Sequence, residues 1–146
     1  MTHRRQREPF VWEGGEVLAY KEDDDTFRSV TRQVLTGAEH GQGTSLRYFE
    51  IGPGGHTTLE RHEHTHVVVP IRGHGRALLV DRVVDLAPHD VAFVPPWGWH
   101  QFRAPHDAAF GFLCAVTAER DRPVRPTAAE LGALRRDPRI AAFVRV

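Results

Sequence analysis

Short segments with β-type residue patterns follow one another between residues 44 and 117, and each one ends at a turn signal. Separators such as Gly52–Gly55, Gly73–Gly75 and Pro95–Pro96 are typical of tight turns. Many short strands at regular spacing favour a sandwich or a barrel, so we predict an all-β fold. The expected strands cover residues 45–51, 57–69, 77–80, 83–86, 91–94, 101–103 and 110–117.

The chain changes character after this β region. Thr127, followed three residues later by Glu130, forms a capping-box pattern, and Asp137–Pro138 supplies a helix stop. We therefore predict a short helical tail over about residues 127–137, after a barrel core of about residues 44–117. We expect the last segment, residues 140–146, to pack onto the barrel or onto a partner subunit because it contains several apolar side chains.

Length and composition limit the protein class. A chain of 146 residues without a long linker or repeat fits a single domain, residues 1–146. The formal net charge of zero argues against a nucleic-acid partner. The sequence has no apolar span of ~20 residues, so we expect no membrane partner. The start is polar and basic, so we expect a cytoplasmic protein. We read Cys114 as a core residue and the acidic run Glu22–Asp25 as a solvated loop.

Histidines at every second position lie within the expected strand 57–69. In an extended strand His62, His64 and His66 would point to one face. His100 follows a Pro- and Gly-containing turn some 34 residues after His66. Imidazole is a common metal ligand, and we predict a metal site formed by these four side chains. The alternative interpretation is a set of surface histidines on a polar strand.

Other polar side chains near these histidines leave the ligand set open. Glu60 has the same strand parity and is either a further ligand or an acceptor that orients an imidazole. Gln101 would point away from His100 in a regular strand, so we rank it low as a ligand. His56, at the start of the strand, is a similarly weak candidate.

Two segments together resemble the motifs of the cupin superfamily, which consists of small jelly-roll (double-stranded β-helix) barrels that hold a metal ion. In the first motif, Gly54, Glu60, His62, His66 and Gly73 occupy the expected spacing. Glu60 then stands where the family has its first histidine, and His66 stands where it has a glutamate. The second motif corresponds to residues 89–104, in which His100 takes the histidine position. The resemblance implies a single cupin barrel.

The segments around 59–68, 94–103 and 131–134 are similar to the small cupin-type cyclases of aromatic polyketide biosynthesis, of the kind found in the resistomycin pathway. This resemblance implies Zn²⁺ and a poly-β-ketone substrate, whose ring closure proceeds by aldol-type condensation and dehydration during antibiotic biosynthesis. A metal-bound water is the expected base, with no catalytic side chain assigned. An imidazole-rich site also suits Fe²⁺, Ni²⁺ or Cu²⁺. The alternatives are a metal-dependent dioxygenase of a phenol or diketone, and a non-catalytic cupin that binds a metal or small molecule.

Cupins commonly pair through strand edges, and the chain has apolar segments near both ends. Phe10–Trp12 and Phe143–Val146 would suit such a contact. We therefore expect a homodimer.

Overall fold

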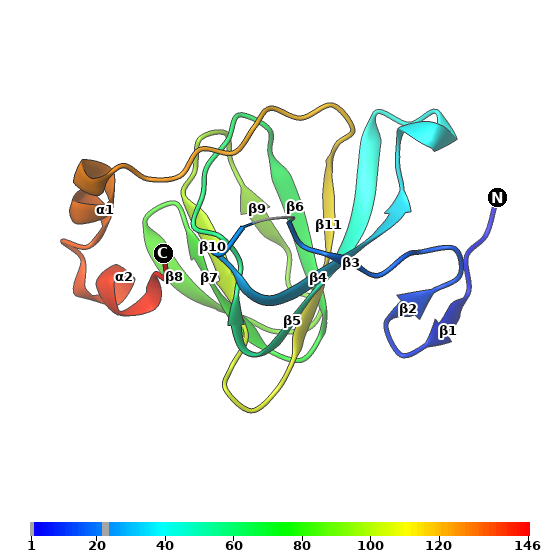
Figure 1. Cartoon of the computed structure of the whole chain (residues 1–146), viewed down its shortest axis with the longest axis horizontal. Coiled ribbons are helices and arrows are strands. Elements are labelled where there is room, and N and C mark those ends of the chain that lie inside the picture. Colours follow the sequence, from blue (N-terminus) through cyan, green and yellow to red (C-terminus); the bar gives the residue numbers. More distant parts are fainter. Residues whose placement is uncertain (1, 22–23) are drawn as a thin grey trace.

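A computed structural model describes residues 2–21 and 24–146. Residues 22 and 23 of the acidic run, and Met1, lie outside the described residues. In this part of the chain, strands β3 to β11 form one curled antiparallel sheet that closes into a half-barrel (Figure 1). The expected all-β cupin barrel is confirmed. The strands are β3 Leu18–Ala19, β4 Arg28–Thr36, β5 Thr44–His56, β6 His66–Arg72, β7 Gly75–Leu79, β8 Arg82–Leu86, β9 Ala92–Val94, β10 His100–Arg103 and β11 Phe110–Thr117.

The long strand β5 organises the sheet. It pairs with β4 along one edge and with β11 along the other, and its last residue, His56, also pairs with Arg103 of β10. The strands follow the order β8-β7-β10-β5-β11-β6-β9, and β3 and β4 branch from β5. This order brings the beginnings of β6 and β10, which are far apart in sequence, to the same end of the barrel.

Alternate residues of these strands fill the barrel. Phe49, Ile51, Phe102, Phe110 and Phe112 are buried together, because residues of a strand that lie two apart point to the same face. Burying an aromatic or branched side chain contributes about 1.5–3 kcal/mol, so these residues stabilise the barrel.

Outside the barrel, a small hairpin precedes the main sheet. It consists of β1 Gln6–Glu8 and β2 Val11–Trp12. Phe10 and Trp12 pack on Tyr48, on the outer face of β5, with ring centroids 5.8 and 5.1 Å apart. The aromatic head segment thus contacts its own chain.

The tail forms a second, smaller core at the other side of the barrel. The helices α1 Ala128–Leu134 and α2 Pro138–Phe143 lie side by side there (Figure 1). Thr127 and Glu130 form the predicted capping box. Ile140, Phe143 and Val144 are buried against Leu59 and Leu78 of the barrel. Helix α2 was not predicted, since Pro138 was read as a stop, whereas it occupies the first turn of a new helix capped by Asp137.

Two sequence expectations need correction. The strand predicted over 57–69 is wrong before His66, because residues 57–65 form an irregular segment with isolated bridges at Glu60 and Arg61. Strand β4 was missed, because its residues do not alternate between apolar and polar. Arg32 faces the same side as Val30, and the polar Gln33 is buried on the opposite side, where it hydrogen-bonds to the backbone of Phe10 and Trp12. Within the described residues, neither helix has the length and apolar character that crossing a membrane requires.

Candidate metal centre

Three imidazoles from different parts of the chain meet at one end of the barrel. His62 comes from the irregular segment after β5, His66 is the first residue of β6, and His100 is the first residue of β10. One nitrogen from each ring lies within 4.8 Å of the others. The Nε2 atoms of His62 and His66 are only 2.9 Å apart. The site therefore does not require three histidines on one strand.

Backbone contacts hold the segment that carries His62. The amide of Trp97, in the turn before β10, donates to the carbonyl of His62 over 2.7 Å. Glu60 and His100 exchange two backbone hydrogen bonds of 3.2 and 3.0 Å. A residue pair joined in this way projects both side chains to the same face, so the Glu60 carboxylate lies beside the His100 ring.

Hydrogen bonds at Nδ1 orient two of the rings. His62 Nδ1 lies 2.7 Å from the His64 carbonyl, and His100 Nδ1 lies 3.0 Å from the Gly98 carbonyl. A carbonyl only accepts, so each Nδ1 carries the proton and each Nε2 presents a lone pair. This is how metal-binding histidines are commonly fixed in one tautomer.

The environment keeps the three rings neutral. Burial, together with the neighbouring imidazoles His100 and His64, lowers the pKa of His62 to about 4. Burial also lowers the pKa of His66 and of His100 below the ordinary value, although Glu60 partly opposes this at His100. Neutral imidazoles are the form that binds a cation.

The spacing of the rings fits a metal ion. With metal–nitrogen distances of about 2.0–2.1 Å and angles of ~90–110°, two bound nitrogens lie about 2.9–3.4 Å apart. The 2.9 Å separation of the Nε2 atoms of His62 and His66 falls in this range. His62, His66 and His100 are thus the residues that would hold a divalent cation.

The Cys114 thiol belongs to the same site. Its Sγ atom lies 3.2 Å from His66 Nδ1, on the side of the ring away from His62. If His66 Nε2 binds a cation, its Nδ1 carries the proton and donates to this sulfur. The sequence analysis read Cys114 as a core residue; it is buried, but it also contacts a candidate ligand. No sequence spacing links Cys114 to His66, and only the pairing of β11 with β6 brings them together.

His64 has a different position. Its ring stacks on His62 with centroids 3.6 Å apart, and its Nδ1 lies 2.5 Å from a carboxylate oxygen of Asp121. The same carboxylate accepts from the amides of Glu63 and His64. Despite desolvation, these hydrogen bonds hold the pKa of Asp121 below its usual value. His62, His64 and Asp121 form a second possible ligand group that shares one ring with the first.

Glu60 is buried and already has polar partners. Its carboxylate accepts from Lys21 Nζ over 2.6 Å and from the Tyr20 hydroxyl over 3.3 Å. Lys21, the sole lysine of the chain, also contacts the Thr58 hydroxyl. The carboxylate therefore connects the N-terminal segment to the histidines, as an outer acceptor or as a further ligand.

The two weaker candidates lie elsewhere. Gln101 points away from the histidines, and its amide hydrogen-bonds to the backbone of Thr57 and Arg145. His56 lies at the end of β5, paired with Arg28 and Arg103, and its Nδ1 is 3.1 Å from the Thr57 carbonyl. Among the described residues, His56 belongs to no group of His, Cys, Asp and Glu side chains that could hold a metal.

The chain is similar to known proteins that have this barrel. A family model described as Cupin domain matches residues 47–116. The chain is 54% identical over 136 residues to the 1-methylthio-D-xylulose 5-phosphate methylsulfurylase of Rhodospirillum rubrum; the match spans 92% of this chain and 86% of that protein. The chain belongs to the cupin family.

Solved cupin structures superpose on the whole chain. A cupin 2 conserved barrel domain protein from Rhodopseudomonas palustris shares 46% identity with a TM-score of 0.93, over 99% of this chain and 100% of that one. The cupin-2 domain protein Rru_A2000 from Rhodospirillum rubrum shares 52% identity with a TM-score of 0.88, over 97% and 95% of the two chains.

The polyketide cyclase RemF from Streptomyces resistomycificus is a more distant match. It shares 19% identity with a TM-score of 0.73, over 89% of this cupin and 93% of that chain. Likeness at this level shows the common fold alone. The expected cyclase activity is not confirmed, and the curated relative with 54% identity carries another name.

Proposed function

We propose that this cupin is a metal-dependent enzyme that breaks the carbon–sulfur bond of a 1-methylthio ketose 5-phosphate. The named relative, which is similar over most of the chain, supports this substrate class. The observation that carries the proposal is the Cys114 sulfur 3.2 Å from His66, because it adds a thiol to a cupin metal site. An imidazole site alone would suit many reactions, whereas removal of a methylthio group needs a proton source beside a polarised carbonyl.

The chemistry of the substrate defines what the site must do. In a 1-methylthio 2-ketose the sulfur-bearing C1 is adjacent to the C2 carbonyl. When a thiolate co-substrate attacks the methylthio sulfur, a disulfide forms and the C1–S bond breaks. The bonding electrons pass to C1 and the carbonyl oxygen, and a proton must then reach C1. The products are a methyl disulfide and a 1-deoxy ketose 5-phosphate.

Residues of the chain fit these requirements. A cation held by His62, His66 and His100 would supply a Lewis acid for the carbonyl oxygen. Burial raises the pKa of the Cys114 thiol, although Arg47 opposes this, so the sulfur keeps its proton near neutral pH. We assign to Cys114 the proton that C1 receives. Its S–H group is buried in the barrel beside His66.

The test uses metal-loaded protein with 1-methylthio-D-xylulose 5-phosphate and dithiothreitol in deuterated water. Mass spectrometry should detect a 1-deoxy ketose phosphate with one deuterium at C1. Cys114→Ala should lower kcat at least a hundredfold and keep the metal content of the wild type, because the proton donor is lost and the imidazoles remain. Arg136→Gln, at the end of α1, is the matched control. Absence of the deoxy product, or full activity of Cys114→Ala, would refute the assignment.

The poly-β-ketone cyclase predicted from the sequence is the second candidate, because its ring closure also requires a carbonyl polarised beside an acidic carbon. A poly-β-ketone chain assayed with the same preparation tests it. Ring closure without turnover of the methylthio ketose would favour the cyclase. Oxygen consumption with a phenol or diketone would favour the dioxygenase, and binding without turnover would favour the non-catalytic cupin.

We propose His62, His66 and His100 as the metal ligands, and the sequence adds His64 as a fourth. Elemental analysis of single alanine variants separates these sets. Loss of metal is expected at His62, His66 and His100, whereas retention in His64→Ala would restrict His64 to holding the Asp121 carboxylate. The same analysis identifies the metal: Zn²⁺ is expected from the cyclase resemblance, with Fe²⁺, Ni²⁺ and Cu²⁺ as the alternatives.

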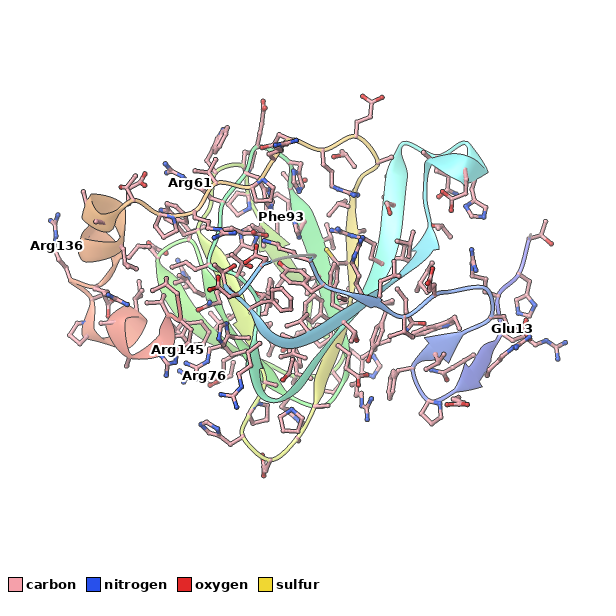
Figure 2. All side chains as sticks on the ribbon, viewed as in Figure 1. Glu13, Arg61, Arg76, Phe93, Arg136 and Arg145 are labelled. Atoms are coloured by element: carbon pink, nitrogen blue, oxygen red, sulfur yellow. The ribbon has the colours of Figure 1, made fainter. Side chains whose placement is uncertain are left out.

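A homodimer also remains our proposal. The aromatic head and the apolar tail, where the sequence places the dimer contact, pack on their own chain. We therefore place the contact on another surface. Val67 and Phe93 are exposed on β6 and on the edge strand β9, where Phe93 is labelled in Figure 2. Light scattering at micromolar concentration tests it, and a monomer in both wild type and Phe93→Glu would refute it.

A further inference from the structure

Arg47 is a buried guanidinium inside the barrel. It lies on β5, opposite Cys114 of β11 and opposite Val34 of β4, and shares a face with the core residue Phe49. Its side chain lies over the Phe49 ring, 4.9 Å from the centroid. The residue is 9% exposed. Arginine is rarely this buried without an ionic partner.

Arg47 lacks a carboxylate partner among residues 2–21 and 24–146. Within the same ranges its buried Nε atom makes no hydrogen bond. One terminal nitrogen approaches the Cys114 sulfur at 3.6 Å, which is a weak contact. Burying an unpaired charge is strongly unfavourable, so a guanidinium kept in this state indicates an anion that is supplied from outside.

Further positive charge surrounds this guanidinium. Arg32, on β4, pairs with Phe49 and faces the same side of the sheet. Arg120 follows β11 and is exposed. Although the residue is exposed as a whole, partial desolvation of its guanidinium, followed by the charges of Arg47 and Arg32, lowers the pKa of Arg120 below its ordinary value. Arg32 and Arg47 thus share one face of neighbouring strands, and Arg120 adds to the same positive field. In the described ranges neither Arg32 nor Arg120 forms an ion pair.

This group, Arg32, Arg47 and Arg120, adjoins the metal centre. The Cys114 sulfur contacts both Arg47 and His66, so one side chain separates the guanidinium from a candidate metal ligand. The charge of Arg47 also contributes to the lowered pKa of His66. One small molecule could therefore reach from an anion site at Arg47 to the three imidazoles.

We propose that Arg47, assisted by Arg120 and Arg32, binds the phosphate of a phosphorylated substrate whose carbonyl end lies at His62, His66 and His100. The inference rests on the proposed function for the identity of the substrate, but the anion site itself does not. Guanidinium groups bind phosphate through paired, charge-assisted hydrogen bonds, which the free Nε of Arg47 can complete. The arginines thereby select for phosphorylated molecules and set their orientation.

The first experiment titrates inorganic phosphate into the metal-loaded full chain by calorimetry at constant ionic strength. The wild type should show one saturable site, and Arg47→Gln should bind at least tenfold more weakly. Arg47→Lys should be intermediate, because it keeps the charge and loses the paired geometry. Arg136→Gln is the matched control and should bind as the wild type does; Figure 2 shows Arg136 at the outer edge of the tail.

Arg120→Gln is a second variant in case Arg47→Gln does not fold. Arg120 is exposed, so its replacement should leave the fold intact, and it should also weaken phosphate binding. Phosphate bound directly at the metal would persist in every arginine variant. If Arg47→Gln folds and binds phosphate as tightly as the wild type, the proposal is overturned. If Arg47→Gln does not fold, equal phosphate affinity of Arg120→Gln and the wild type overturns it. Absence of binding to the wild type at millimolar phosphate would do the same.

The second experiment compares kcat/KM for 1-methylthio-D-xylulose 5-phosphate and for the same ketose without phosphate. The wild type should prefer the phosphorylated form, and Arg47→Gln should lose this preference through a raised KM for that form alone. An unchanged preference in the variant would refute the phosphate role. If the wild type turns over neither compound, the proposed function fails, while the phosphate titration still decides the anion site.

Discussion

Gln101 provides a direct test of which side chains serve the metal centre and which serve the fold. It follows His100 in β10 and is fully buried. Its Nε2 donates to the carbonyls of Thr57 and Arg145 over 2.8 and 2.7 Å, and its Oε1 accepts from the amide of Arg145 over 2.9 Å. The side chain thus ties the end of the chain to the barrel. We expect Gln101→Met to reduce stability while leaving the metal content unchanged.

The magnitude follows from these contacts. A buried hydrogen bond contributes about 0.5–1.5 kcal/mol net, so three bonds amount to about 1.5–4.5 kcal/mol. The lower half applies, because the Thr57 carbonyl also lies 3.1 Å from His56 Nδ1 and Arg145 is exposed to water. Methionine keeps most of the volume, so the expected loss is about 1.5–3 kcal/mol. Gln101→Ala should add ~1 kcal/mol because it leaves a cavity.

Urea unfolding followed by circular dichroism measures this loss as a shift of the midpoint at constant m-value. Elemental analysis of the same samples reports the metal. A folded Gln101→Met protein without metal would contradict our placement of Gln101 and return it to the ligand set. A stability change below ~0.5 kcal/mol would show that water replaces the hydrogen bonds of the tail.

Three further expectations concern local structure. Gly73→Ala should lower the free energy of unfolding by more than ~1 kcal/mol, because the residue has φ +63° and an added Cβ would meet the Ala109 carbonyl; an unchanged urea midpoint would contradict this. Thr127→Ala should lose about 1 kcal/mol with the capping box, which thermal unfolding measures against Thr117→Ala on the exposed end of β11. Asp121→Asn should be less stable than the wild type near neutral pH. Because folding lowers the pKa of Asp121, this difference should shrink as the pH falls below ~4, and a gap that widens in acid would have the wrong sign.

Much of the fold could be predicted because local signals and burial agree. Glycine- and proline-containing turns separate most strands, and the capping box at Thr127 begins α1 as expected. Strand β4 and helix α2 escaped prediction for local reasons. Arg32 and the buried Gln33 break the apolar–polar alternation of β4, and Pro138 can either end a helix or begin one. Such ambiguities are settled by packing against the barrel, which is not visible in a short window of sequence.

The candidate site was predictable in composition more than in geometry. His62, His66 and His100 meet as expected, but through the approach of β6, β10 and an irregular segment rather than along one strand. Cys114 and Arg47 have no motif around them. Their roles depend on which residues β11 and β5 place opposite one another and beside β6, that is, on long-range register.

The carbonyl contacts that fix the rings of His62 and His100 have a practical consequence for handling the protein. Because His64 and Gly98 orient these rings from within the chain, the barrel does not depend on a cation to arrange them. Loading then follows folding as a separate event, and the ion found after purification reflects the growth medium as well as the preference of the site. Stripping with a chelator and refilling with a chosen metal should be reversible, so a series of metal-substituted proteins can be prepared from one batch.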